Sequence, residues 1–132
     1  MSLNVNKCTV LSYTKSKNPI TYNYVLNNAP VPRRTLIKDL GITFDIKLNF
    51  NNHVSNLVIF ALKMLGFVIR TCKEFTNLSV LKTLYFTFIR SKLEFCTLIW
   101  FPIYNKQKLA LELVERKFLK YLNYKSTGVW PP

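Results

Sequence analysis

Few residues of this chain could take part in acid–base or metal chemistry. The 132 residues include a single histidine, His53, and six carboxylates, of which only Asp39 and Asp45 are aspartates. The three cysteines stand at positions 8, 72 and 96 and form no CxxC pair. A histidine-based triad, a two-carboxylate hydrolase centre and a zinc cluster each need a denser set of such groups. Composition therefore favours a binding protein over an enzyme.

Cationic side chains are far more abundant. Nineteen lysines and arginines against six acids give a formal net charge of +13. Residues 51–132 alone hold twelve of the bases and four of the acids, so the charge is not confined to a tail. This balance indicates a polyanionic partner, most simply nucleic acid. An anionic membrane surface comes second, and a merely solvated basic surface is the plain alternative.

The cysteines and the apolar stretches indicate in which cellular compartment the protein is expected. The odd number and wide spacing of the cysteines predict a reducing, intracellular setting, cytoplasm or nucleus, with the thiols buried. No signal peptide is expected, because Asn4, Asn6 and Lys7 fall where its apolar core would run. The most apolar stretch, residues 57–69, contains Lys63 and is shorter than the about 20 residues of a spanning helix, which favours a core helix.

The front of the chain carries the patterns of strands. Residues 8–14 are β-branched and aromatic and end at a polar stretch, which predicts a strand. Residues 20–26 alternate between apolar and polar side chains, and the Asn-Asn pair that follows suits the positive φ angles of a tight hairpin turn. Residues 36–44 predict a further strand, in which Gly41 marks a bulge or a close approach by another backbone.

After residue 50 the pattern becomes helical. Asn51 or Asn52 can cap a helix to about residue 73, which should be central because it is apolar almost all round. Two more helices are expected, over residues 78–100 and 105–124. The sequence therefore predicts an α+β fold in two parts, a small antiparallel β-hairpin unit (residues 1–50) followed by a three-helix bundle (residues 51–132).

Several short segments occur in a fixed order: LNVNKC (3–8), KDLGITFD with the Leu, Phe and His that follow (38–53), ALKMLGF (61–67), RSKLEFC with the next Ile-Trp (90–100) and RKFL (116–119). Together they resemble the reverse transcriptases of non-LTR retrotransposons, especially the jockey-like elements of arthropods. In that family the first segment is motif D, L-x-x-N-x-x-K-[TC]. The second, K-x-L-G-x-x-x-D-x-x-L-x-F-x-x-H, forms a hairpin beside the primer terminus, and the others belong to helices of the thumb.

The resemblance implies that residues 1–50 are the end of a palm, with motif D and a primer-grip-like region, and that residues 51–132 are thumb-like. The parent activity would be RNA-directed DNA polymerisation, to which this truncated fragment would contribute template–primer binding. The family's catalytic aspartates lie upstream of motif D and have no counterpart here. We therefore expect the chain alone to be inactive, with no catalytic residue, metal ligand or cofactor; Mg²⁺ is expected only for the intact parent enzyme.

A thumb holds its duplex by the phosphates, which needs cations on one helical face. Lys63, Arg70 and Lys73 recur at intervals of seven and three residues and so share one side of the first helix. Lys7 matches the motif D lysine, a proton donor in the family, and without the aspartates a solvated lysine is the favoured alternative. The predicted nucleic-acid-binding residues are Lys38, Gly41, Lys63, Arg70, Lys73, Lys82, Arg90, Lys92, Lys117 and Lys120.

Other interpretations stay open. One is a standalone basic nucleic-acid-binding or protein-interaction module, and another is an inactive relic. Neither a small-molecule substrate nor a membrane is an expected partner, whereas self-association through an exposed palm-facing surface is expected. Glu94 should form a structural ion pair with Arg90, four residues earlier, and Trp100 should belong to the core.

Overall fold

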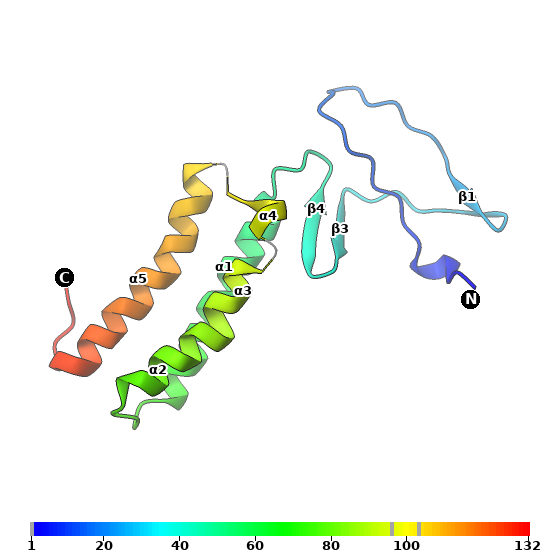
Figure 1. Cartoon of the computed structure of the whole chain (residues 1–132). Helices are drawn as coiled ribbons and strands as arrows, with labels where there is room; N and C mark the ends of the chain where they lie inside the picture. Colours follow the sequence, from blue (N-terminus) through cyan, green and yellow to red (C-terminus); the bar gives the residue numbers. More distant parts are fainter. Residues whose placement is uncertain (1, 96, 103) are drawn as a thin grey trace. The chain divides into compact units, whose positions relative to one another are not determined.

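The computed structural model describes residues 2–95, 97–102 and 104–132 (Figure 1). The chain divides into two compact units, Met1–Phe50 and Asn51–Pro132. The first contains two small antiparallel hairpins and the second contains the α-helices. The α+β fold class predicted from the sequence is therefore confirmed.

The first hairpin joins β1 (Val25–Leu26) to β2 (Ala29–Pro30). Asn27 and Asn28 between them have φ angles of 51° and 60°, in the left-handed region that asparagine tolerates well. The predicted Asn-Asn turn is thus confirmed, but its strands are much shorter than expected. Beyond Pro30 one more hydrogen bond joins the two arms, from the Val31 N–H to the Tyr24 carbonyl (2.9 Å), so Pro30 occupies a position that needs no N–H donor.

The second hairpin joins β3 (Leu36–Asp39) to β4 (Ile42–Asp45), with Leu36 opposite Asp45 and Asp39 opposite Ile42. Leu40 and Gly41 form the connection, with φ angles of 49° and 83°. The prediction of one continuous strand over residues 36–44 is therefore wrong. Gly41 is not at a bulge but completes a two-residue turn, which needs positive φ at both positions.

The strand predicted for residues 8–14 is also absent. Within the described residues this segment makes one isolated β-bridge, between Val10 and Arg33, supported by a hydrogen bond from the Val10 N–H to the Pro32 carbonyl (2.9 Å). The neighbouring segment contains Pro30 and Pro32, which cannot donate to a ladder, so the bridge does not extend into a strand.

The first unit has little core of its own. Among its described residues only Ile42 and Asp45 are buried, at 2% and 8% exposure. The Asp45 carboxylate accepts hydrogen bonds from the backbone N–H groups of Lys47 (3.3 Å) and Phe50 (3.1 Å), which fixes the chain after β4. Apolar burial therefore contributes little to the stability of this unit.

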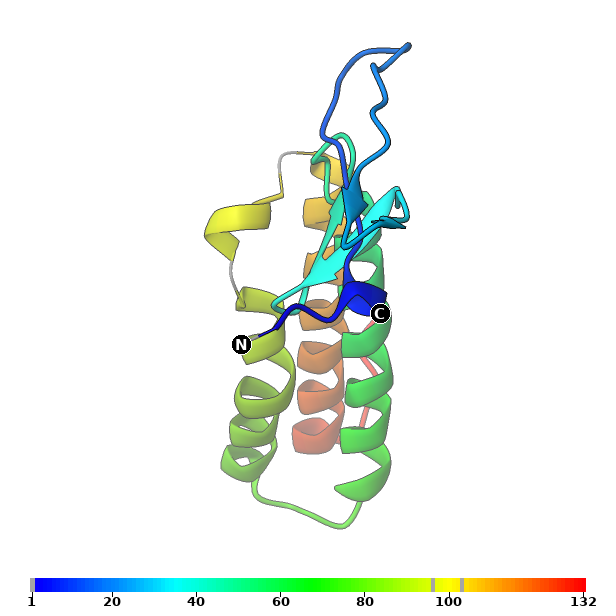
Figure 2. The ribbon, with the colours of Figure 1, turned by 90° about the vertical axis from the view of Figure 1, so that its right-hand side faces the viewer.

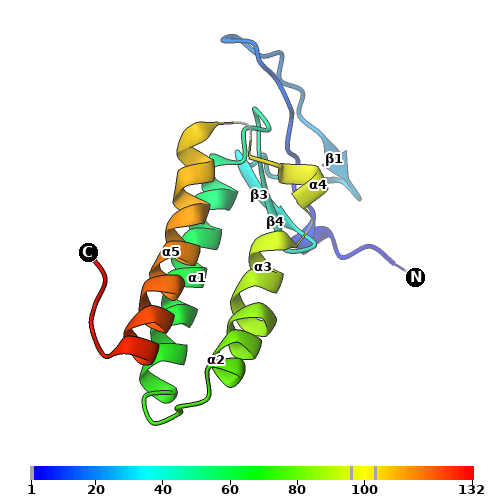
Figure 3. The same ribbon diagram turned by 60° about the vertical axis from the view of Figure 1, so that its left-hand side comes forward.

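The second unit is a helical bundle (Figures 2 and 3). Its described elements are α1 (Asn51–Thr71), α2 (Leu78–Tyr85), the π-helix η2 (Phe86–Arg90), α3 (Ser91–Glu94), α4 (Thr97–Trp100) and α5 (Asn105–Thr127). They pack as three segments: α1, the continuous run from α2 to α3, and α5. α1 and α5 run in the same direction, and the run from α2 to α3 goes the opposite way (Figure 1). At the starts of α1 and α5, the Gln107 side chain donates to that of Asn51 (2.6 Å).

Each helical segment contributes one apolar stripe to the core. Between α2 and α5 the rings of Tyr85 and Phe118 stack face to face, with centroids 4.0 Å apart. α1 packs against both other segments, but so does α5, and one side of α1 stays exposed, so the prediction of a helix buried at the centre is wrong. The buried apolar residues of α1 recur every three or four positions, at Val54, Leu57, Val58, Ala61, Leu65 and Val68.

The helix predicted over residues 78–100 is interrupted. It starts as expected, with the Asn77 side chain capping the Ser79 N–H (2.9 Å), but it widens into the π-helix η2 and stops at Phe95, whose ψ is 122°. The Phe95 carbonyl accepts a hydrogen bond from the Trp100 indole (2.7 Å). The break thus brings Trp100 into the core at 1% exposure, as the sequence predicted.

Among the described residues, α1 is the one helix that is long and apolar enough to cross a membrane. Core helices of soluble proteins share both properties. Its outer side keeps three large apolar residues exposed, Ile59, Phe60 and Phe67.

Candidate nucleic-acid interface

Two of the predicted cations, Lys63 and Arg70, stand on the exposed side of α1, opposite its buried stripe. They are two turns apart, so they share this side, as their spacing predicts. Lys73 was predicted on the same side of this helix, but α1 ends at Thr71 and Lys73 lies in the turn beyond it. Arg70 folds back over Gly66: a Cβ built on that glycine would lie 3.2 Å from Nη1 of Arg70. The absent side chain at Gly66 therefore leaves room for the guanidinium against the helix.

A groove runs between α1 and α5, which lie side by side (Figure 3). It consists of two adjoining pockets of about 360 and 530 Å³, both lined by Ile69, Tyr121 and Trp130. We call it the α1/α5 groove. Lys117 and Lys120 line the first pocket, and Lys73 and Lys125 line the second. None of the described residues that line either pocket is acidic.

A hydrogen bond joins the two walls of the α1/α5 groove near the carboxyl ends of both helices. The Lys125 ammonium donates a hydrogen bond to the Lys73 carbonyl, just beyond the end of α1. Gly128, with φ of 77°, then ends α5 in a left-handed cap, its N–H donating to the Tyr124 carbonyl (2.7 Å). The cap turns the tail back along the helix (Figures 1 and 3).

The remaining predicted helical cations, Lys82, Arg90 and Lys92, lie on the segment from α2 to α3. Arg90 forms an ion pair with Glu94 (2.8 Å), so that predicted pair is confirmed. This hydrogen bond, with the charge of Glu94, raises the pKa of Arg90. The Lys92 ammonium lies over the ring of Phe60, 5.7 Å from its centroid. Arg90 and Lys92 therefore already have partners within the unit.

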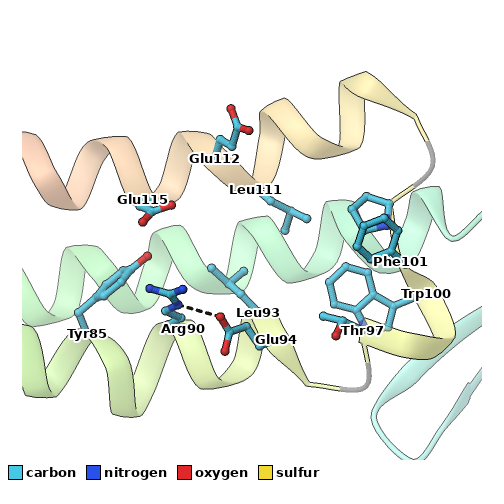
Figure 4. A pocket seen from close by; sticks show the side chains of 11 residues that line it. Tyr85, Arg90, Leu93, Glu94, Thr97, Trp100, Phe101, Leu111, Glu112 and Glu115 are labelled. Atoms are coloured by element: carbon cyan, nitrogen blue, oxygen red, sulfur yellow. Dashed lines mark hydrogen bonds and ion pairs between the residues drawn. The ribbon is translucent and has the colours of Figure 1, made fainter.

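A second groove, the α3/α5 groove, opens on the other side of α5, with a volume of about 300 Å³. Figure 4 shows Glu112 and Glu115 projecting from α5 and the Arg90–Glu94 pair on the opposite wall. Glu112 also pairs with Arg116 (3.3 Å). Burial, then the charge of Glu115, raises the pKa of Tyr85, which lines the same groove. Three of the chain's four glutamates thus lie here.

The other predicted site residues belong to the first unit. Lys38 is exposed on β3, where it pairs with Thr43, and Gly41 forms the turn. Lys7 is exposed at the end of η1 (Val5–Lys7), a short 3-10 helix rather than a strand end.

The two aspartates do not form a metal centre together. Asp39 lies at the turn end of the second hairpin and Asp45 at its open end, three ladder positions or about 10 Å apart. A two-metal centre needs carboxylates that clamp ions about 4 Å apart. Among the described residues no group of three or more His, Cys, Asp or Glu side chains could hold a metal ion.

Several residues that line the α1/α5 groove were not among the predicted site residues, and Lys125 and Trp130 are the two that matter most for binding. Lys125 follows Lys117 by eight positions, a spacing that could have placed it near the same side of the helix. Trp130 carries no such periodic signal, because it reaches the groove only through the turn at Gly128.

The chain matches no protein-family model, no curated protein and no solved structure. The resemblance to reverse transcriptases therefore rests on the sequence motifs alone.

Proposed function

We propose that the helical unit, Asn51–Pro132, binds nucleic acid through its phosphate backbone. The observation that carries this proposal is the separation of charge around α5. Lys117 and Lys120 line one groove, whereas Glu112 and Glu115 line the other. A polyanion would be attracted to the first side and repelled from the second.

The cations on and beside the α1/α5 groove are not neutralised within the protein. Among the described residues, ion pairs involve only Arg90 and Arg116, both outside this groove. The uncompensated set available for phosphate contacts is Lys63, Arg70, Lys73, Lys117, Lys120 and Lys125. Such contacts give affinity that depends on salt and little on base sequence.

The sequence motifs support a more specific form of the proposal. The chain would be a fragment of an RNA-directed DNA polymerase of a non-LTR retrotransposon, and its helices would hold the template–primer duplex. A standalone nucleic-acid-binding module would bind in the same way. An Asp-Asp motif encoded in the DNA immediately upstream would favour the fragment, and an unrelated upstream sequence would favour the module.

Fluorescence anisotropy with an RNA–DNA hybrid and two unrelated sequences tests the binding. Each phosphate contact releases condensed counterions, so affinity should fall linearly with salt on logarithmic axes, with a slope of about −0.9 per contact. Four to six contacts predict a loss of about 10²–10³-fold between 50 and 200 mM salt. An affinity that does not change with salt would contradict backbone binding.

A pair of triple variants locates the contacts. Replacing Lys63, Arg70 and Lys73 by Gln should lower the steepness of the salt dependence by about 2–3, because three candidate contacts are lost. The matched control replaces Lys7, Lys15 and Lys17 by Gln, which removes the same charge from the first unit. The control should change the slope by less than 1. Equal effects of the two triples would assign the affinity to net charge alone.

A further inference from the structure

We propose that the α1/α5 groove takes an unpaired nucleic-acid strand, with one base stacked on Trp130 and the adjoining phosphates at Lys117 and Lys120. This inference rests on the proposed function and extends it, because phosphate contacts alone do not distinguish an unpaired strand from a duplex.

Trp130 has the geometry of a stacking platform. One face of its indole lies against the ring of Tyr124, with centroids 4.6 Å apart and planes within 10° of parallel. The residue is nevertheless 58% exposed, so a second ring can reach its other face. Trp130 also lines both pockets of the groove. Bases stack on exposed aromatic rings in proteins that bind single strands.

The size and polarity of the groove fit a nucleotide better than an apolar ligand. Its pockets, about 360 and 530 Å³, lie within the about 300–1,000 Å³ typical of ligand sites. The hydroxyl of Tyr121, which lines both pockets, is buried and makes no hydrogen bond to any described residue. Burial also raises the pKa of Tyr121. Because this hydroxyl is shielded from solvent, the polar groups that a ligand in the groove can reach are the four lysines, Lys73, Lys117, Lys120 and Lys125.

The surrounding charge selects for phosphates next to the stacked base. Lys117 and Lys120 are exposed on one side of Trp130, and Lys73 and Lys125 line the other pocket. An acidic peptide would satisfy these cations but would bring no base to stack. A duplex would satisfy them too, but its bases are already stacked and paired. Of these three polyanions, the unpaired strand is the one that uses both the indole and the lysines.

Tryptophan fluorescence tests this arrangement on the full chain. Trp130 is exposed, whereas Trp100, the other tryptophan, is 1% exposed and supplies a constant background. We expect a thymidine decanucleotide to quench the emission of Trp130 and a blunt duplex of equal length to leave it nearly unchanged. Trp130→Leu should weaken single-strand binding about 5- to 150-fold, the range for one lost stacking contact, and change duplex binding less than twofold.

Two matched variants guard against indirect effects. Trp130→Phe keeps an aromatic ring and should retain most of the single-strand affinity. Phe101→Leu removes an aromatic residue of similar exposure, 65%, from the acidic α3/α5 groove and should change neither affinity. Circular dichroism of each variant shows whether the helices are retained.

The results distinguish failure of this inference from failure of the proposed function. Unchanged single-strand affinity in Trp130→Leu would overturn the inference, as would equal quenching by polyglutamate, which carries charge without bases. Salt-dependent duplex binding without quenching by the single strand would overturn the inference and leave the proposed function standing. Failure to bind either nucleic acid would overturn both.

Discussion

The two grooves beside α5 are built on one helix and yet carry opposite charge. The α1/α5 groove is lined by four lysines and by no described acidic residue, whereas the α3/α5 groove is lined by three glutamates. The buried stripe of α5, which includes Val114, Phe118 and Tyr121, separates the two sides. Along the sequence the charges of residues 112–120 look mixed, but around the helix they are sorted.

This difference matters because a bare count of charges does not locate a binding surface. The helical unit holds twelve bases, but Arg90 and Arg116 are paired with glutamates at the α3/α5 groove and Lys92 lies over an aromatic ring. Of the nine described bases without such partners, six lie on or just beyond α1 or line the α1/α5 groove from α5, whereas Lys82, Lys106 and Lys108 line neither of its pockets. Three measurements, in decreasing order of expected effect, can break or sharpen this contrast.

The largest effect is expected on stability, when a buried residue of α5, the helix that both grooves share, is truncated. Phe118 is buried in the stripe of α5 and stacks on Tyr85 at 4.0 Å. Phe118→Ala removes this stack and leaves a cavity, so we expect a loss of about 3–5 kcal/mol in the free energy of unfolding. Urea denaturation followed by circular dichroism measures it. The control Leu119→Ala changes the exposed neighbour and should cost less than about 1 kcal/mol. Similar losses for the two variants would refute the assigned core.

The second effect is on binding. Lys117→Glu with Lys120→Glu gives the α1/α5 groove the charge of its neighbour. At about 0.1 M salt each phosphate contact contributes close to a factor of ten, so losing two should weaken duplex binding about 50- to 100-fold, and repulsion should add to this. Anisotropy titrations measure the change. Glu112→Lys with Glu115→Lys is the opposite reversal, made on the other side of the same helix. If the glutamate reversal changes affinity strongly and the lysine reversal does not, the duplex binds at the α3/α5 groove and not at the α1/α5 groove.

The sequence predicted the helices far better than the strands. α1 and α5 follow from long apolar periodicities, and the Asn77 cap from the residue type. The residue pattern alone predicted one strand where the second hairpin lies, because the turn places Leu40 at a positive φ, where leucine is uncommon and gives no turn signal. A hairpin in this segment was expected only from the resemblance. The absent strand at residues 8–14 depends on a partner segment in which Pro30 and Pro32 stop the ladder, and local pattern does not include that partner.

The candidate site likewise has features that the sequence could predict and features that it could not. The shared side of Lys63 and Arg70 could be predicted, because helical spacing alone decides it. The α1/α5 groove could not, because it requires residues about 50 positions apart to face each other in two helices that run the same way. Nor could the position of Trp130, which follows from the left-handed turn at Gly128. Self-association through an exposed palm-facing surface stays a prediction.

The smallest effect separates position from net charge. Glu94→Gln and Glu74→Gln each remove one negative charge, but Glu94 pairs with Arg90 at the α3/α5 groove and Glu74 directly follows Lys73 of the α1/α5 groove. The Arg90–Glu94 pair is well exposed, at 44% and 61% of the two side chains, so its loss should cost less than about 1 kcal/mol of stability.

If phosphates bind at the α1/α5 groove, Glu74→Gln should raise duplex affinity about two- to fivefold. The reason is that it removes a like charge within about 10 Å of the bound anion at 0.1 M salt. Glu94→Gln should raise it less than twofold, although it frees an arginine. Anisotropy at 50 and 200 mM salt measures both, and a larger gain for Glu94→Gln would move the binding surface to the α2–α3 segment.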